Sequence, residues 1–232
     1  MRVARPLAAV LILALIVSPA CAPPHEAAGG RVLKELPPDI DPESSYAFYL
    51  HGQIIEDRGI RPTHPEFGVY EYEAIVESLA AAGLVVISEA RPAGTDGRAY
   101  ARKVVDQVTS LLEAGVPPNR ISVVGFSKGG GIAVEVSSVL ENEHVTFVFL
   151  GTCPARVPNP PELQLQGRIL SIHEASDSIA GPCELFFSNG TVGPEMEELE
   201  LRLGGGHGAF YRPDPEWLDP VISWVTAPRR TS

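Results

Sequence analysis

Short apolar runs alternate with longer amphipathic stretches along most of this chain. Apolar runs typical of buried strands occur at Ser45–Leu50, Leu84–Ser88, Ile121–Val124, Val145–Leu150, Arg168–His173 and Glu197–Leu203, and Arg31–Leu36 is a candidate edge strand. Apolar residues at helical spacing predict helices over Tyr70–Ala82, Arg98–Ala114, Glu216–Val225 and from Gly129 to about Leu140. Strands that are apolar throughout and alternate with helices predict an α/β fold, in which a mostly parallel central sheet carries helices on both faces.

The first twenty residues have the pattern of an export signal. Arg2 and Arg5 precede the apolar run Leu7–Val17, and residues 18–20 resemble the site that a signal peptidase cuts. The apolar run is too short to span a bilayer comfortably. We therefore expect residues 1–20 to be a cleaved signal peptide, and the protein to be exported to the periplasm or cell envelope.

Cys21 directly follows this segment, where it resembles the lipidated cysteine of bacterial lipoproteins. The match to that pattern is incomplete, because Ser18 stands where leucine is usual and Pro19 where a small non-proline residue is usual. Cleavage before Cys21 without lipidation is the alternative. Residues 21–44 are expected to form a tether and an N-terminal edge segment, with a lipid on Cys21 as the means of membrane attachment.

The length of the chain limits its domain organisation, and its net charge limits the classes of partner. The chain has 232 residues, of which 44% are apolar, so residues 45–232 are expected to form a single domain with a full-sized core. The formal net charge is −11, and loss of two arginines with the signal peptide would make it more negative. Such a surface repels phosphate backbones and anionic headgroups, which excludes nucleic acid as an expected partner.

Two cysteines remain in the predicted mature domain, Cys153 and Cys183. An exported protein meets an oxidising compartment, so an even pair predicts one disulfide, with two free buried thiols as the alternative. Neither cysteine has another cysteine or a histidine at metal-ligand spacing, which argues against a metal site.

A glycine-flanked serine supplies the strongest chemical signal. The pentapeptide Gly125-Phe126-Ser127-Lys128-Gly129 lies between the strand that ends at Val124 and the helix predicted from Gly129. The pattern G-x-S-x-G in this context predicts a nucleophile elbow, a sharp turn that lifts the serine hydroxyl clear of the sheet and that needs glycine on both sides. The pentapeptide alone is a weak signal, but the strand before it and the helix after it strengthen it considerably.

Two further side chains follow predicted strands and could complete a catalytic site. Asp177 comes after strand Arg168–His173, and His207 comes after strand Glu197–Leu203, within a run of glycines. Because parallel strands end at the same edge of a sheet, residues just past those ends can converge on Ser127. Glu174 and Asp214 are alternative acids.

With these three motifs the chain resembles a small member of the α/β-hydrolase superfamily, similar to compact serine esterases and dienelactone-hydrolase-like proteins. The chain order Ser127, Asp177, His207 is the order of nucleophile, acid and base in that superfamily. The resemblance implies that Ser127 attacks an acyl carbon, that His207 acts as the base and that Asp177 orients it. It implies backbone oxyanion donors at Lys128 and, after His51-Gly52, at Gln53, and it implies no cofactor or metal.

The resemblance also bears on the substrate. Relatives with a cap insert it after the strand that follows the nucleophile helix, but here residues 151–167 span only 17 positions and contain Pro154, Pro158, Pro160 and Pro161. We therefore expect no cap domain and an open cleft, in which residues 53–68 form a loop at the rim. The expected function is hydrolysis of short-chain carboxylic esters through an acyl-enzyme. An acyltransferase, lactonase or peptidase with the same triad, or a non-catalytic binding lipoprotein, is the alternative.

The remaining polar candidates are expected to have structural or surface roles. His51 should form hydrogen bonds within the oxyanion loop, and the side chain of Lys128 should be solvated, with contact to an anionic substrate as the alternative. The other histidines have no partner pattern that points to catalysis; they are His25, His64, His144 and His173.

Overall fold

The computed structural model describes residues 29–156, 162–188, 190–193 and 195–227. The predicted signal peptide, Cys21 and the first part of the tether lie outside the described residues, as do Pro158, Pro160 and Pro161. In the part that is described, no helix is both long enough and apolar enough to cross a membrane.

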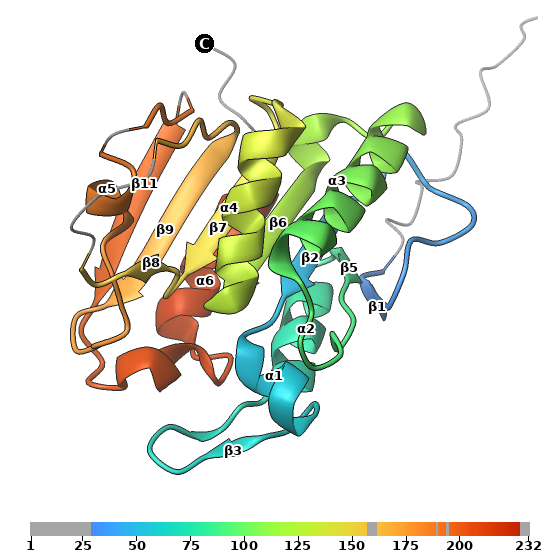
Figure 1. The fold of residues 1–232 in the computed structure, drawn as a ribbon. Coiled ribbons are helices and arrows are strands. Elements are labelled where there is room, and N and C mark those ends of the chain that lie inside the picture. The colour runs from blue at the N-terminus through green and yellow to red at the C-terminus, as the bar shows by residue number, and fades with distance from the viewer. Residues whose placement is uncertain (1–28, 157–161, 189, 194, 228–232) are drawn as a thin grey trace, which may run out of the picture.

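Seven strands form one central sheet, and every pairing within it is parallel. Their order across the sheet is β1, β5, β2, β6, β7, β9, β11 (Figure 1). Their bounds are β1 Arg31–Leu33, β2 Tyr46–Leu50, β5 Val85–Ile87, β6 Ile121–Phe126, β7 Thr146–Leu150, β9 Arg168–Glu174 and β11 Glu195–Leu201. The predicted α/β fold with a parallel sheet is therefore confirmed.

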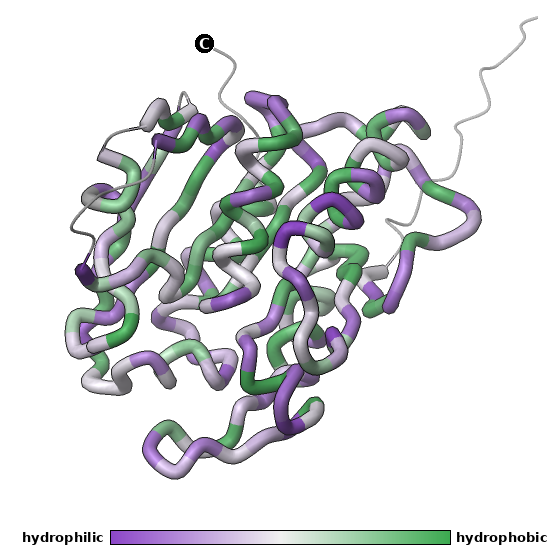
Figure 2. Tube along the Cα trace, viewed as in Figure 1, coloured by the Kyte–Doolittle hydropathy of each residue, from purple (hydrophilic) through white to green (hydrophobic). Residues whose placement is uncertain are grey.

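Helices cover both faces of this sheet (Figure 1). The helices are α1 Gln53–Arg58, α2 Tyr72–Ala81, α3 Gly97–Glu113, α4 Lys128–Leu140, α5 Cys183–Phe186 and α6 Pro215–Thr226, with 3₁₀ turns η1 Pro118–Arg120 and η2 Gly206–Phe210. Helices α3 and α4 contribute to one apolar cluster and helices α2 and α6 to the other. Two buried faces explain why the central strands are runs of hydrophobic residues, which Figure 2 shows.

Alternation along β2 illustrates how one strand serves both clusters. Tyr46 and Phe48 belong to the cluster of α3 and α4, whereas Ala47 and Tyr49 belong to the cluster of α2 and α6. All four side chains are at most 1% exposed. Successive residues of a strand point to opposite faces, so a strand buried on both sides favours apolar side chains at every position.

Edge strand β11 departs from the expectation that every strand is apolar throughout. It reads Glu-Met-Glu-Glu-Leu-Glu-Leu, and its four glutamates are exposed. Only one neighbour, β9, pairs with it in the sheet. Negative charge along an edge opposes pairing with other chains, so a polar pattern is consistent with this position.

The prediction of a continuous loop over residues 53–68 was wrong. Helix α1 occupies Gln53–Arg58, and the short strands β3 Thr63–His64 and β4 Gly68–Val69 form an antiparallel hairpin. A helix of six residues is too short to show a helical period in the sequence. Ile55, only 2% exposed, anchors the helix in the core.

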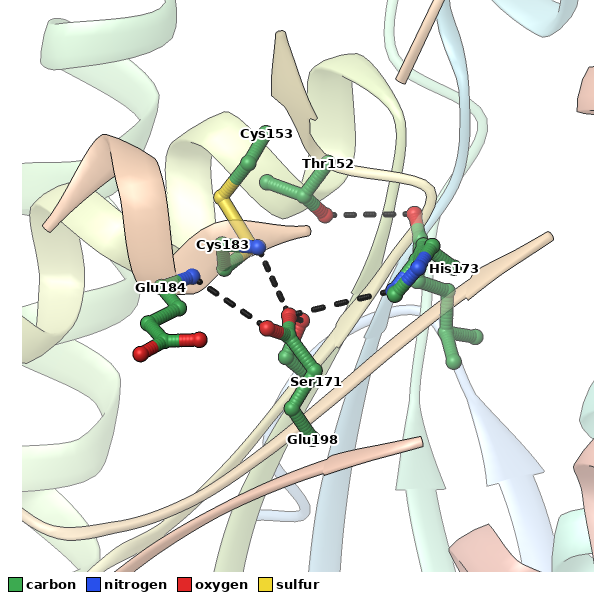
Figure 3. The surroundings of a disulfide bond; sticks show 8 residues. Thr152, Cys153, Ser171, His173, Cys183, Glu184 and Glu198 are labelled. Atoms are coloured by element: carbon green, nitrogen blue, oxygen red, sulfur yellow. Dashed lines mark hydrogen bonds and ion pairs between the residues drawn. A yellow bond between two sulfur atoms is a disulfide. The ribbon is translucent and has the colours of Figure 1, made fainter. Parts of the chain in front are cut away.

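The predicted disulfide is present between Cys153 and Cys183. Cys153 lies in β8 Cys153–Pro154, which pairs with β10 Ala180–Gly181, and Cys183 begins α5. In Figure 3 the Glu198 carboxylate lies beside the disulfide, where it accepts hydrogen bonds from the Cys183 backbone N–H at 2.6 Å and from the Ser171 hydroxyl at 2.8 Å. The bridge therefore joins two segments that follow neighbouring strands.

Replacing both cysteines by serine should lower the free energy of unfolding by about 3–4 kcal/mol. The bridged residues are 30 positions apart, and a cross-link of that span removes loop-closure entropy of this size from the unfolded chain. Urea denaturation of the oxidised protein and of the Cys153→Ser/Cys183→Ser variant would measure the difference. Equal midpoints with equal slopes would contradict the prediction.

Candidate active site

Ser127 sits on a sharp turn between the carboxyl end of β6 and the start of α4. Its backbone has φ 53° and ψ −117°, a conformation that non-glycine residues rarely adopt. Strand β7 and helix α4 hold it in place, because its N–H donates to the Leu150 carbonyl at 3.0 Å and its carbonyl accepts from Gly131 N–H at 3.0 Å. Strain maintained by surrounding structure is typical of a nucleophile elbow.

Steric contacts explain why both ends of the pentapeptide, Gly125 and Gly129, are glycine. A Cβ at Gly125 would lie 2.3 Å from the Gly129 carbonyl oxygen, and one at Gly129 would lie 1.9 Å from the Leu50 carbonyl oxygen. Both separations are far below a normal contact, and both involve backbone atoms that cannot move aside. The close approach of α4 to β2 and β6 therefore requires glycine at these positions.

His207 meets Ser127 from a turn that is 80 residues further along the chain. Its Nε2 lies 2.9 Å from Ser127 Oγ. It belongs to the 3₁₀ turn η2, and the flanking Gly206 has φ 54°, which a residue with a side chain rarely adopts. The Phe126 ring, 5.0 Å away between centroids, packs against the imidazole. The glycine-rich sequence around His207 thus permits the tight turn that presents it to the serine.

Asp177 completes a chain of hydrogen bonds. Its Oδ2 lies 2.7 Å from His207 Nδ1, and its Oδ1 accepts the N–H groups of Ile179 at 2.8 Å and Ala180 at 3.1 Å. The carboxylate is fully buried. Burial alone would raise its pKa, but the hydrogen bond and charge of His207 and the two backbone donors outweigh it and lower the pKa below its ordinary value.

This geometry determines which ring nitrogen carries the proton. The Asp177 carboxylate can only accept, so His207 Nδ1 must donate to it. Nε2 of the neutral ring then presents a lone pair toward Ser127 Oγ. The arrangement can remove a proton from the serine hydroxyl and hold it.

Neither alternative acid has the position of Asp177. Glu174 accepts backbone N–H groups of Leu203 at 3.0 Å, Gly204 at 3.1 Å and Gly206 at 3.1 Å, and so holds the glycine loop that leads to His207. Burial would raise the Glu174 pKa, but these bonds and those from Ser176 lower it below its ordinary value. Asp214 occupies the position before α6, where its backbone starts that helix.

His51 has the structural role that was expected. The N–H of Arg91 donates to its Nε2 at 2.9 Å, which leaves Nδ1 protonated and able to donate to the Gly52 carbonyl at 2.8 Å. Burial, with the nearby Arg91 charge, lowers the pKa of His51 to about 4, so the ring is neutral at pH 7. A Cβ built on Gly52 would lie 3.6 Å from Ser127 Cβ, so the loop after His51 borders the elbow.

The two expected oxyanion donors each begin a helix. Lys128 is the first residue of α4 and Gln53 is the first residue of α1, and the first N–H groups of a helix have no acceptor within it. The expectation of a solvated Lys128 side chain was wrong. Its Nζ forms an ion pair with Glu56 at 2.5 Å and donates to the Thr95 carbonyl at 2.8 Å.

Sequence reasoning also missed the buried pair Glu56 and Arg91. Arg91 Nε lies 2.8 Å from Glu56 Oε1, and neither side chain is exposed. Their signal in the sequence was positional, since Arg91 follows the carboxyl end of a central strand as the catalytic candidates do. Nothing in the sequence paired it with a glutamate 35 residues earlier.

His173 is buried against the edge strand β11, which agrees with a structural role. Its ring nitrogens lie 3.9 Å from Glu198 and 3.6 Å from Glu200, both on β11. His64 stacks on Phe67, with 4.5 Å between ring centroids. His25 lies outside the described residues.

A cavity of about 740 Å³ is lined by the loop that carries His207, including the glycines at 204–206, together with Phe67 and Arg212. Ser127 is not among its lining residues, so we do not assign the substrate to it. Among the described side chains, no group of three or more His, Cys, Asp or Glu residues could hold a metal ion.

Solved structures that resemble this one include two with a TM-score above 0.5. Arabidopsis thaliana SOBER1 superposes with a TM-score of 0.53 at 14% identity, over 78% of this chain and 97% of that chain. A protein from Desulfitobacterium hafniense, described as an α/β-hydrolase family protein, gives a TM-score of 0.54 at 9% identity, over 81% of this chain and 98% of that chain. No protein-family model and no curated protein matches the sequence.

Identities this low are evidence about fold and not about activity. The likenesses agree with the seven parallel strands and the helices on both faces of the sheet. This chain has the α/β-hydrolase fold, without a cap domain in the part of the chain that the structure describes.

Proposed function

We propose that this protein is a serine hydrolase that cleaves small carboxylic esters through an acyl-enzyme on Ser127. The observation that carries the proposal is the continuous hydrogen-bond chain from Ser127 through His207 to buried Asp177. A nucleophile, a base and an orienting acid within hydrogen-bond distance are what acyl transfer to a hydroxyl requires.

In the proposed reaction Ser127 Oγ attacks the ester carbonyl carbon while its proton passes to His207 Nε2. The tetrahedral intermediate collapses as the C–O bond to the alcohol breaks, and His207 returns the proton to the leaving oxygen. A water molecule then attacks the acyl-enzyme with His207 again as the base, which releases the acid and restores Ser127. Asp177 stabilises the imidazolium in both steps and keeps its own negative charge.

Backbone N–H groups of Lys128 and Gln53 are the proposed donors to the developing oxyanion. Their support is position: Lys128 directly follows the nucleophile, and Gln53 directly follows Gly52, which borders Ser127. Both begin helices, where unpaired N–H groups favour negative charge. Loss of one such donor typically raises the barrier by about 3–4 kcal/mol.

Fluorophosphonate labelling tests the proposal directly. A serine activated by His207 should react rapidly, and peptide mapping should place the adduct on Ser127, whereas a binding protein that only shares the fold should remain unlabelled. Labelling of the protein unfolded in urea serves as the control, because it removes the histidine from the serine. Absence of labelling in the folded protein would refute an active hydrolase.

Short acyl chains should be the better substrates. Without a cap there is little apolar surface to enclose a long chain, so kcat/KM for p-nitrophenyl acetate or butyrate should exceed that for the palmitate ester. The comparison is made below the solubility limit of palmitate and at equal detergent concentration. Faster cleavage of palmitate would contradict the open-cleft argument while leaving the triad intact.

A further inference from the structure

Glu56 is a buried carboxylate that the proposed chemistry does not use. It lies in α1, and its side chain has no exposed area. Oε1 accepts from Arg91 Nε at 2.8 Å, and Oε2 lies 2.5 Å from Lys128 Nζ. Burial alone would raise the Glu56 pKa, but the hydrogen bonds from Lys128 and Arg91 prevail and lower it, so the group is a carboxylate at pH 7.

These contacts join two elements that have no covalent link near the site. One is α1, which begins at Gln53, and the other is the start of α4 at Lys128, 72 residues from Glu56. Each element carries one of the two proposed oxyanion donors. A single carboxylate therefore ties the backbone of one donor to the side chain of the other.

Arg91 extends the same connection to the loop between β2 and α1. Its guanidinium donates to the His51 carbonyl, and its backbone N–H donates to the His51 ring at 2.9 Å. Arg91 is 2% exposed, and its Nη1 has no hydrogen-bond partner among the described groups. Burying an arginine is costly unless it is paired, and here Glu56 and the His51 carbonyl supply the partners.

We propose that Glu56 is a positioning residue that sets the distance between the two oxyanion donors at Gln53 and Lys128. The inference rests on the proposed function, because it assigns a task within that same site. Glu56 acts through Lys128 and Arg91 and does not contact the substrate. Loss of the link should leave substrate binding unchanged and impair the step in which the oxyanion forms, because a displaced donor stabilises the transition state less well.

If Glu56 acted only through its charge, its removal would have the opposite effect on the rate. Two cations and one carboxylate give the cluster a net charge of about +1 beside the site of a developing anion, since the His51 ring is neutral. Replacing Glu56 by glutamine would raise that charge and, by charge alone, would favour the oxyanion. A fall in kcat after this change thus separates positioning from simple electrostatics.

The test compares Glu56→Gln and Lys128→Met with wild type, using p-nitrophenyl butyrate and fluorophosphonate. Lys128→Met removes the link to α4 but keeps the buried Glu56–Arg91 pair, so it is expected to fold even if Glu56→Gln does not. We expect kcat to fall roughly 10- to 100-fold in each variant with KM within about twofold, and labelling to slow in parallel. Lys128→Arg, which keeps a cation for Glu56, should recover most of the activity.

Glu43→Gln is the matched control, because it removes an exposed ion pair with Arg120 and lies outside the site. It should keep wild-type kcat. Wild-type or higher kcat in folded Glu56→Gln, wild-type kcat in Lys128→Met, or a loss that appears only in KM would overturn the inference and leave the proposed hydrolase standing. A wild-type protein that neither cleaves esters nor labels would instead overturn the proposed function, and the inference with it.

Discussion

Replacing Ser127 by alanine is expected to reduce kcat for p-nitrophenyl butyrate by roughly a million-fold, to the level of the uncatalysed reaction plus whatever binding contributes. The change removes the atom that forms the acyl-enzyme and leaves His207 and Asp177 without a nucleophile to activate. Initial rates and burst amplitudes at saturating substrate measure the effect, and the fluorophosphonate adduct should disappear with it.

The fold should tolerate this substitution well. Alanine at φ 53° carries the same Cβ strain as serine, and among the described residues the interaction lost is the hydrogen bond to His207 Nε2. The thermal midpoint of the variant should therefore stay close to that of wild type, which separates a loss of chemistry from a loss of structure. A correctly folded Ser127→Ala protein with its full esterase rate would refute the mechanism.

Replacing Asp177 by asparagine is expected to reduce kcat by about 10⁴-fold. An asparagine amide can donate to His207 Nδ1, which favours the tautomer with the proton on Nε2 and points a hydrogen, rather than a lone pair, at Ser127. The imidazolium that forms during attack also loses its neighbouring charge. With its proton on Nε2, His207 cannot accept the proton of Ser127, and at high pH only an external base can do so. The measurement is therefore kcat across pH 6–10 with matched buffers.

Two companion variants identify the acid. Glu174→Gln keeps the Asp177–His207 bond and weakens the anchoring of the glycine loop, so its loss of activity should be far smaller, on the order of tenfold. Asp214→Asn should retain wild-type activity. If Glu174→Gln were as damaging as Asp177→Asn, with both proteins folded, the assignment of Asp177 as the orienting acid would fail.

Much of the fold could be predicted because burial in the core imposes a regular pattern of apolar residues on the sequence of strands and helices. Runs such as Val145–Leu150 are buried on both faces of the sheet, where apolar residues predominate, so the sequence pattern and the strand agree to within a residue. Glycines that stop helices, such as Gly83 with φ 90°, mark ends that the backbone itself requires. Helix α1 escaped for the converse reason, since a six-residue helix imposes little pattern. Edge strand β11 was expected at Glu197–Leu203 and lies at Glu195–Leu201, but its exposed glutamates depart from the apolar pattern of the central strands.

The residues of the candidate site also fall into those that the sequence revealed and those that it did not. Ser127 could be found because the steric demands of its turn are local and leave glycines at fixed offsets. Asp177 and His207 could be proposed because parallel strands end at one edge of a sheet. Glu56 and Arg91 could not, because an ion pair between a loop helix and a distant strand end leaves no spacing to read.

What the sequence by itself determined are the features encoded by neighbours along the chain: the alternation of buried strands and helices, the elbow around Ser127 and the even pair of cysteines in the mature domain. What only the tertiary structure decided is which distant groups meet. In the folded protein His207 is paired with Asp177 and not with Glu174, and the Lys128 side chain points inward to Glu56. The physical reason is that such contacts depend on the three-dimensional register of loops, whose conformations are set by packing and hydrogen bonds across the whole fold.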